Sequence, residues 1–316
     1  MWKEEIYNLL KINQIDFEYI NEQSVFELIF IPKHQIYLHL IDLKTFQENN
    51  LPNNYFLQYS DTINAKNQRV IHLWEDVYLS KTELVKSRIL AMLGIFTRLH
   101  ARHCFIERID KSTVHNFLEI NHLQGFVKAK FKYGLFLKPQ YVERFVGTVV
   151  CGDTDNGSGF GVVVCGDTDN GNAQITMPKL IAVATFSGGR TMKVGERTGK
   201  RSYELIRFAS LKGFVVVGGM DKLLKTFIKE HNPDDIMSYA DRDWSDGRSY
   251  DKLGFIKTEN STPQLFYINP KTFERKSNDD INCVRVFNSG SIKFIKTTKK
   301  SSVEATEDFV IENFKE

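Results

Sequence analysis

The sequence predicts an α/β protein of mixed α+β type, divided into two main domains. Its 316 residues suffice for two domains of ordinary size. Short apolar runs that suit buried strands alternate with segments of helical periodicity. The composition, 42% hydrophobic and 26% charged, is typical of a soluble globular protein. No apolar run approaches the roughly 20 residues that a membrane span needs.

Charge and cysteine content indicate the setting of the chain. The net charge of +3 permits nucleic-acid binding but does not argue for it. The first residues, Met-Trp-Lys-Glu-Glu, do not resemble a signal peptide. The cysteines have no C-x-x-C spacing, which favours a reduced protein; they are Cys104, Cys151, Cys165 and Cys283. We therefore expect a cytoplasmic protein with no membrane partner, and the oligomeric state stays open.

Residues 1–96 are predicted to form the first domain. A short amphipathic helix around Ile6 leads into strands, and a second group of elements follows them. The expected strands are Phe17–Ile20, Val25–Ile31, Ile36–Leu43 and Arg69–Trp74, and the later helices are Asn53–Asn67 and Ser80–Leu93. This order resembles the core of the PD-(D/E)xK nucleases. Within it, Val70–Asp76 followed by Lys86–Ile89 resembles very-short-patch-repair and homing nuclease domains.

The metal-binding residues of such a nuclease are replaced in this chain. The resemblance implies an Asp on the second strand and Glu-x-Lys on the third, which hold a divalent metal. The matching positions carry Leu28, His39 and Ile41, while Glu27 and Asp42 lie on the opposite face or off register. We therefore expect a degenerate nuclease-like domain without a metal site. A structural or DNA-docking role is favoured over an active homing-type endonuclease.

Residues 97–275 are predicted to form the second domain. Its first part includes His100, His103 and Cys104, which fit either a metal site or the start of a strand or turn. A helix is expected from Asp110 to Glu119, before the loop Asn121–Gly125. Two nearly all-apolar central strands then pair with each other, at Tyr133–Leu137 and Leu180–Ser187.

Two segments of this domain stand apart from that pattern. The nine residues VVCGDTDNG occur at 149–157 and again at 163–171, which predicts a duplicated β-arm insertion over 146–176. The second segment is a basic glycine-rich loop with Arg190, Lys193, Arg197, Lys200 and Arg201. This loop is either a solvated face or a surface that contacts phosphate groups.

The stretch from Val215 to Phe255 contains a strand, a glycine turn and a helix. The apolar run Phe214–Val217 is followed by Gly218 and Gly219, then by a helix that ends at Asn232-Pro233. Backbone N–H groups in the first turn of such a helix lack partners and attract anions. A tight turn with nothing bound is the alternative. A strand at Ile236–Tyr239, an acidic loop and a short helix at Ser249–Leu253 complete the stretch.

This stretch resembles the C-terminal half of the GNAT family of acyl-CoA-dependent N-acyltransferases. The similarity rests on the acidic loop and on Tyr-x-x-Leu-Gly-Phe at 250–255, although the family's usual Arg/Gln-x-x-Gly-x-Gly/Ala turn is not kept. More of the chain, from Tyr203 to Gly247, resembles a phage and bacterial GNAT-like set that includes the DNA-modification protein Mom. The resemblance implies acetyl-CoA or a related acyl-CoA as cofactor, held by Val217, Gly218, Gly219, Met220 and Lys222.

Acyl transfer to an amine requires a base for the amine proton and an acid for the leaving group. Asp241 and Asp243 are the candidate bases or substrate ligands, with helix capping as the alternative, and Tyr250 is the acid that the resemblance implies. The candidate substrate-binding residues are His122, Gln124, Glu204, Arg207, Tyr239, Trp244 and Ser245. The resemblance and the basic loop favour an acceptor amine on a base of DNA or RNA that stacks on Trp244. The alternative is a protein or small-molecule amine, with Trp244 buried under the final helix. A non-catalytic DNA-binding protein of a mobile element is the competing class.

Residues 276–316 are predicted to form a C-terminal strand pair and tail. The strands at Val284–Phe287 and Ser291–Lys296 are expected to form a hairpin turned at Asn288-Ser289-Gly290. A strand at Gln264–Ile268 is expected to close the second domain before this hairpin.

Overall fold

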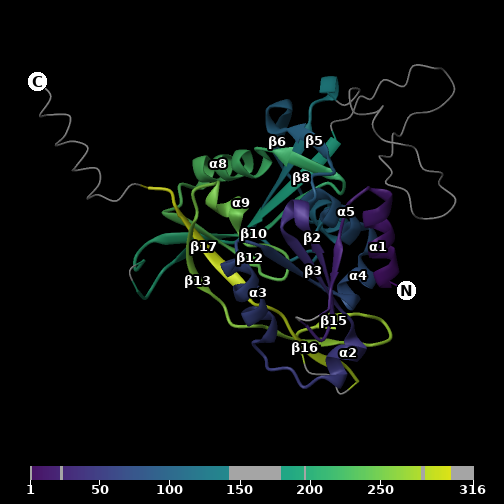
Figure 1. The fold of residues 1–316 in the computed structure, drawn as a ribbon. Coiled ribbons are helices and arrows are strands. Elements are labelled where there is room, and N and C mark those ends of the chain that lie inside the picture. Colours follow the sequence, from purple (N-terminus) through teal and green to yellow (C-terminus); the bar gives the residue numbers. More distant parts are fainter. Residues whose placement is uncertain (1, 22–23, 142–178, 196, 279–281, 300–316) are drawn as a thin grey trace, which may run out of the picture.

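The computed structural model describes residues 2–21, 24–141, 179–195, 197–278 and 282–299. It confirms the mixed α+β class, since helices pack on two principal sheets (Figure 1). Within these ranges, no helix is both long and apolar enough to cross a membrane. The expected β-arm at 146–176 lies outside the described residues.

The first sheet has the strand order β1-β2-β3-β4. Strands β1 to β3 are antiparallel neighbours, and β4 runs parallel to β3. The strands are β1 (Glu18–Ile20), β2 (Glu27–Ile31), β3 (Ile36–Ile41) and β4 (Arg69–Trp74). The helices are α1 (Trp2–Ile12), η1 (Pro32–His34), α2 (Leu43–Glu48), α3 (Tyr55–Ala65), α4 (Glu75–Ser80) and α5 (Thr82–Met92).

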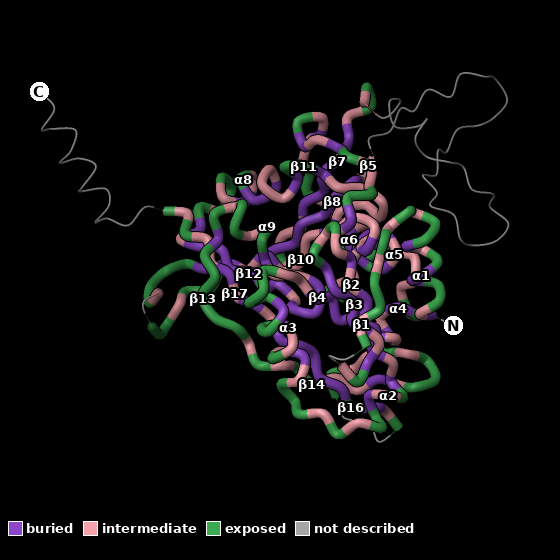
Figure 2. The backbone as a smooth tube through the Cα atoms, in the orientation of Figure 1, coloured by how far each residue is buried: buried purple, intermediate pink, exposed green. Residues whose placement is uncertain are grey.

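Helices cover both faces of this sheet. Helices α1, α4 and α5 share one core with Leu38 and Leu40, whereas α2 and α3 pack with Ile41 and Trp74. Side chains alternate between faces along a strand, so β3 supplies both cores and all six of its residues are buried. Figure 2 shows β3 and β4 as buried between more exposed helices.

The predicted order of helix, three strands, helix, strand and helix is confirmed for this region. The structure adds α2 and α4, which the sequence analysis did not anticipate. Helix α2 begins after Asp42, whose Oδ1 accepts a hydrogen bond from the backbone N–H of Thr45 at 2.8 Å. Such an N-cap stabilises a helix that is too short to show apolar periodicity.

The second sheet has the order β13-β17-β12-β10-β8-β7-β6, and β9 pairs with β10. Its strands are β6 (Cys104–Arg108), β7 (Phe131–Leu137), β8 (Lys179–Phe186), β9 (Arg190–Thr191), β10 (Arg201–Ser210), β12 (Asp235–Asp241), β13 (Ile256–Asn260) and β17 (Ser291–Thr297). The predicted antiparallel pairing of the two apolar strands is confirmed by β7 and β8. Strands β10 and β12 are the parallel pair of this sheet.

Helices also cover both faces of the second sheet. Helix α8 (Gly219–His231) packs Leu223 and Phe227 against one face, where the rings of Phe227 and Phe186 stack at 3.9 Å between centroids. Helix α6 (Lys111–Asn121) packs against Val183 on the other face. The helix predicted after the two glycines is therefore confirmed. It ends at His231, with Asn232 as its C-cap, as the Asn-Pro sequence predicts.

Two small sheets and a short helix complete the described structure. Strand β5 (Thr97–His100) pairs in parallel with β11 (Phe214–Val217), and η2 (Ala101–His103) follows β5. Strand β14 (Leu265–Ile268) pairs with β15 (Arg275–Lys276) and β16 (Val284–Phe287). Helix α9 (Arg248–Asp251) lies between β12 and β13.

The structure corrects the expected C-terminal hairpin. Strand β16 pairs with β14, whereas β17 lies between β12 and β13 in the second sheet. The backbone N–H of Ser289, in the expected turn, donates instead to Asp243 Oδ1 at 2.8 Å, which separates the two strands. Strand β14 likewise does not close the second sheet. It packs on the first one, because Ile268 and Val286 share a core with Phe56 and Trp74.

Candidate active site

A cavity of about 480 Å³ opens where β10 and β12 separate. The two strands pair over Ser202–Glu204 and Asp235–Met237, and β10 shifts register against β8 after Leu205. Beyond this point both strands continue without pairing to each other. The cavity is lined from β10 by Glu204, Leu205, Ile206, Arg207 and Phe208, and from other elements by Arg88, His122, Leu123, Gln124, Met220, Tyr239, Ala240, Asp241, Trp244, Ser245, Ser249, Tyr250, Ser261, Gln264 and Ser291.

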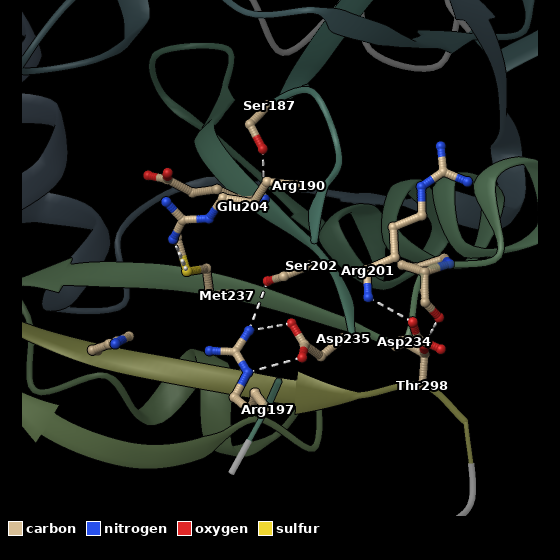
Figure 3. A network of polar contacts seen from close by, with 12 residues as sticks. Ser187, Arg190, Arg197, Arg201, Ser202, Glu204, Asp234, Asp235, Met237 and Thr298 are labelled. Atoms are coloured by element: carbon tan, nitrogen blue, oxygen red, sulfur yellow. Dashed lines mark hydrogen bonds and ion pairs between the residues drawn. The ribbon is translucent and has the colours of Figure 1, made fainter. Parts of the chain in front are cut away.

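A polar cluster holds the paired ends of the two strands together (Figure 3). Arg197 Nε donates to Asp235 Oδ2 at 2.9 Å, and Arg197 Nη2 donates to Ser202 Oγ at 2.6 Å. The carboxylate of Asp235 is buried, so a paired cation is needed there. Nearby, the backbone N–H of Arg201 donates to Asp234 Oδ2 at 2.6 Å. Arg197 of the basic loop is thus structural, and the described residues of this loop, 190–195 and 197–201, do not line the cavity.

Asp241 lies at the C-terminal end of β12 and lines the cavity. Its Oδ1 accepts from the backbone N–H of Asp243 at 3.0 Å, and its Oδ2 accepts from Gln124 Nε2 at 3.0 Å. Burial, and next the neighbouring charge of Asp243, raise the pKa of Asp241 to about 6. A carboxylate with this pKa is ionised at neutral pH and still accepts a proton readily, as a general base must.

Asp243 lies outside the cavity. Its side chain is 3% exposed. Oδ1 accepts from the backbone N–H and hydroxyl of Ser289, and Oδ2 accepts from Trp74 Nε1 at 3.1 Å. These bonds occupy both oxygens, so we assign Asp243 a structural role and do not retain it as a candidate base.

Tyr250, on α9, places its hydroxyl in the cavity wall. The hydroxyl shares a hydrogen bond of 2.9 Å with Ser238 Oγ, and its ring stacks on Phe294 with centroids 5.0 Å apart. Burial raises the pKa of the phenol. The group therefore stays protonated at neutral pH and is able to donate a proton.

The glycine turn brings the first turn of α8 to the cavity. Gly218 has φ of 74° and precedes the helix, and Met220 lines the cavity. The side chain of Lys222 makes other contacts and is not assigned to the cofactor site. Its Nζ donates to the carbonyl oxygens of Ala101 at 2.9 Å and Cys104 at 2.6 Å. Val217 ends β11 with its side chain 46% exposed and does not line the cavity.

The candidate substrate-binding residues gather around the same cavity. His122, Gln124, Glu204, Arg207, Tyr239, Trp244 and Ser245 all line it. Burial, followed by the charges of Arg207, Arg88 and Lys81, lowers the pKa of His122 to about 3. His122 is therefore neutral at physiological pH. Arg207 donates to the carbonyl oxygens of Gly125 and Ile206 rather than to Glu204.

Arg88, on α5 of the first region, is a cavity residue that the sequence did not predict. It lines the cavity, and its guanidinium carbon lies 5.5 Å from the ring centroid of Trp244. Trp244 is 5% exposed and belongs to the core beneath the first sheet, so its ring is not open for stacking. Arg88 falls between buried positions on an amphipathic helix, such as Leu84 and Ile89. A charged residue on an otherwise apolar helix face was the sequence pattern that could have identified Arg88 as a site residue.

The alternative metal sites find no support in the described residues. No group of three or more His, Cys, Asp or Glu side chains there is arranged to hold a metal ion. Cys104 starts β6 and is buried. In the first sheet, Leu28 and Ile41 are buried, and His39 Nδ1 shares a hydrogen bond of 3.0 Å with His72 Nδ1.

No protein-family model matches the sequence, and no curated protein was found to be similar to it. Among solved structures, the chain is similar to an acetyltransferase from Bacillus subtilis in complex with CoA, at 10% identity and a TM-score of 0.31 over 62% of this chain and 99% of that one. It is similar to the NatC complex bound to Gag peptide and CoA, at 9% identity and a TM-score of 0.31 over 62% and 99%. A third similar structure is the histone acetyltransferase HPA2 and related acetyltransferase from Corynebacterium glutamicum, at 9% identity and a TM-score of 0.33 over 63% and 99%. Similarity this low supports no functional inference.

Proposed function

We propose that the chain is a GNAT-like, acyl-CoA-dependent N-acyltransferase. The observation that carries the proposal is the cavity between the separating strands β10 and β12, which Asp241 and Tyr250 both line. A base of raised pKa and a protonated phenol in one cavity are the two groups that acyl transfer to an amine requires. The hydrogen bonds to Gln124 and Ser238 fix the orientation of both side chains.

The cavity also fits an acyl-CoA. Met220 brings the start of α8 to its wall, where the backbone N–H groups of Gly219 to Asp221 have no partner within the helix. Such amides bind pyrophosphate, aided by the positive end of the helix dipole. Gly218 takes a left-handed φ, which glycine adopts without strain. The unpaired edges of β10 and β12 leave space for an extended acyl arm.

Each residue then has a defined task. A bound acyl-CoA supplies an activated acyl carbon and a thiolate leaving group. Asp241 takes a proton from the attacking amine, the amide bond forms as the thioester C–S bond breaks, and Tyr250 gives its phenol proton to the thiolate. An ammonium acceptor first loses one proton to solvent through Asp241, which frees the lone pair that attacks, and Asp241 later releases to solvent the second proton that it takes. The phenol regains one proton from solvent, so one proton is released overall for each ammonium acceptor.

A substitution pair at Met220 tests the cofactor site. Met220→Glu adds a negative charge next to the bound pyrophosphate, and an acid in the first turn is compatible with the helix. Met220→Gln has the same size without the charge. We expect calorimetry with acetyl-CoA to show at least tenfold weaker binding for Met220→Glu and near wild-type binding for Met220→Gln. Wild-type protein that gives no heat at millimolar acetyl-CoA would contradict the proposed function.

The sequence resemblance offers one candidate acceptor for this reaction, an amine on a nucleic-acid base, in a protein of phage or mobile-element type. A base extruded from the stack needs an aromatic surface. Trp244 is covered, but Tyr239 is 42% exposed and lines the cavity beside Asp241. Nucleoside masses from cells that express the wild type or Asp241→Asn test this acceptor. If no new nucleoside depends on the wild-type protein, the nucleic-acid acceptor is excluded.

The competing class is a DNA-binding protein without catalysis. In a protein of that class, side chains are expected to fill the space beside the glycine turn where a coenzyme would otherwise bind. The open cavity at Met220 favours the enzyme instead.

A further inference from the structure

One wall of the cavity carries a cation, Arg88, that has no hydrogen-bond or ion-pair partner among the described residues. Arg88 is the lining residue that comes from the first 96 positions. Its Nε is buried without a hydrogen-bond partner, and no ion pair joins Arg88 to another residue in the described ranges. Its aromatic contact is the ring of Trp244. A desolvated guanidinium without a counter-ion is unfavourable for folding, so a binding role explains it better than a structural one.

The other cationic side chain that lines the cavity, Arg207, already makes hydrogen bonds to the protein. Arg207 donates to two backbone carbonyl oxygens. Its pKa is lowered by burial and supported by the charges of Glu204 and Asp241. Arg207 thus uses two of its five N–H donors on the backbone, whereas Arg88 makes no hydrogen bond to another described residue and keeps all of its donors for a ligand.

A negative charge lies near Arg88 in the same cavity. Burial lowers the pKa of Arg88, and the negative charge of Asp241 raises it. The two groups therefore interact electrostatically. They form no ion pair with each other, because Asp241 accepts instead from Gln124 and the backbone of Asp243. Among its described lining residues, the cavity thus presents the unpaired cation of Arg88 and two carboxylates, Asp241 and Glu204, of which Asp241 is the one whose charge acts on Arg88.

We propose that Arg88 and Asp241 form the acceptor site for a small zwitterionic amine, with its ammonium at Asp241 and its carboxylate or phosphate at Arg88. The inference rests on the proposed acyl transfer and adds the class of acceptor. A guanidinium binds either oxyanion through two parallel N–H donors. The buried ring of Trp244 supports the guanidinium from one side and limits its rotation.

A zwitterion matches this cavity better than a nucleic-acid base does. The exocyclic amine of a base carries no charge, whereas an ammonium is attracted by the Asp241 carboxylate, which also takes its proton. The cavity of about 480 Å³ must hold the acyl arm as well, which leaves room for a small acceptor. The basic loop, which would suit a polyanion, does not line it.

Matched probes test the oxyanion requirement directly. β-Alanine is compared with β-alaninamide, and phosphoethanolamine with ethanolamine, so that each pair differs only in the oxyanion. Calorimetry is performed on wild-type protein saturated with CoA, so that no turnover occurs. We expect at least tenfold tighter binding for the oxyanion-bearing member of one pair, and the pair that responds distinguishes a carboxylate from a phosphate.

Variants then assign the effect to Arg88. Arg88→Gln is expected to remove the tenfold preference while leaving acetyl-CoA binding and the affinity for the probe without the oxyanion unchanged. Arg88→Lys keeps the charge but loses the paired donors, so part of the preference should remain. Arg98→Gln, an exposed arginine on β5 outside the cavity, is the control and should behave as wild type.

Failure of this inference differs from failure of the proposed function. Wild-type protein that does not bind acetyl-CoA overturns both. Protein that binds acetyl-CoA but binds both members of each pair equally overturns only the Arg88 site. Acyl label from acetyl-CoA that appears in DNA or RNA and in no small amine also overturns it.

Discussion

At the scale of single residues, Asp241 controls the pH dependence that the proposed reaction should show. Its folded-state pKa is raised to about 6, so the carboxylate becomes protonated, and inactive as a base, when the pH falls below that value. Burial and the charge of Asp243 raise this pKa, while the hydrogen bonds from the backbone N–H of Asp243 and from Gln124 oppose the rise. We expect kcat/KM to fall about tenfold per pH unit below the pKa. Activity that stays constant from pH 8 to pH 5 would contradict this role.

Substitution of Asp241 provides the companion prediction. Asp241→Asn keeps the shape and the acceptor oxygen but cannot take the amine proton, so kcat should fall by about 100-fold or more. Asp251→Asn, an exposed carboxylate on α9, is the matched control and should leave kcat unchanged. The pH profile of the residual activity should also lose its acidic limb.

The sequence predicted some of these residues and not others, for a physical reason. Asp241 was predicted because it follows a recognisable strand, and Tyr250 because its Tyr-x-x-Leu-Gly-Phe segment resembles that of a known family. Asp243 looks equivalent to Asp241 in sequence, yet its partners Trp74 and Ser289 lie 169 and 46 positions away. Arg88 meets the cavity only because the first region packs against the second. Contacts between residues so far apart in the sequence produce no local sequence pattern from which they could be predicted.

At the scale of elements, the polar cluster at the start of β10 and β12 determines where the strands separate. Arg197 pairs with Asp235, whose side chain is 2% exposed. Removing one partner of a buried pair leaves an uncompensated charge, at a cost of about 3–5 kcal/mol. We therefore expect Arg197→Met to lower the free energy of unfolding by that amount in urea titrations.

A double-mutant cycle checks this prediction. Arg197→Met combined with Asp235→Asn should cost clearly less than the sum of the single substitutions, because no charge is then left unpaired. Lys193→Met, an exposed cation in the same loop, should have little effect. Additive costs in the cycle would show that the cluster does not act as a pair.

Local chemistry made some elements predictable and not others. The glycine turn, α8 and the strand after it follow from Gly218, Asn232 and the apolar spacing between them. Strands β16 and β17 have correct local signals as well, but their pairing depends on Ser289 binding Asp243 rather than forming a turn. A hairpin is the default for two strands this close in sequence, and one long-range carboxylate overrides it.

At the scale of the whole molecule, the two regions are joined by shared cores. Trp244 packs with Val85 in the core of the first region, and strands β14 and β16 from the end of the chain pack on its other face. Arg275 on β15 donates twice to the buried carboxylate of Asp76, at 2.8 and 2.9 Å. Figure 1 shows β15 and β16 beside α2. The front region therefore depends on C-terminal residues for its packing.

This arrangement predicts a single unfolding transition for both sheets. All three tryptophans, Trp2, Trp74 and Trp244, lie in the cores of the front region. Fluorescence therefore reports on that region, while far-ultraviolet circular dichroism reports on every helix and strand. Coincident urea midpoints from the two probes are expected. Separate midpoints would mean that the front region unfolds independently.

Asp243→Ala tests the link itself. The substitution leaves Trp74 Nε1 and the backbone N–H of Ser289 as buried donors without a partner. Each such group costs about 1–3 kcal/mol, so the free energy of unfolding should fall by at least about 2 kcal/mol. Both probes should shift to lower urea together, since the lost bonds join β4 to the segment before β17. A shift in fluorescence alone would show that Asp243 supports only the front region, and that the two sheets do not fold as one unit.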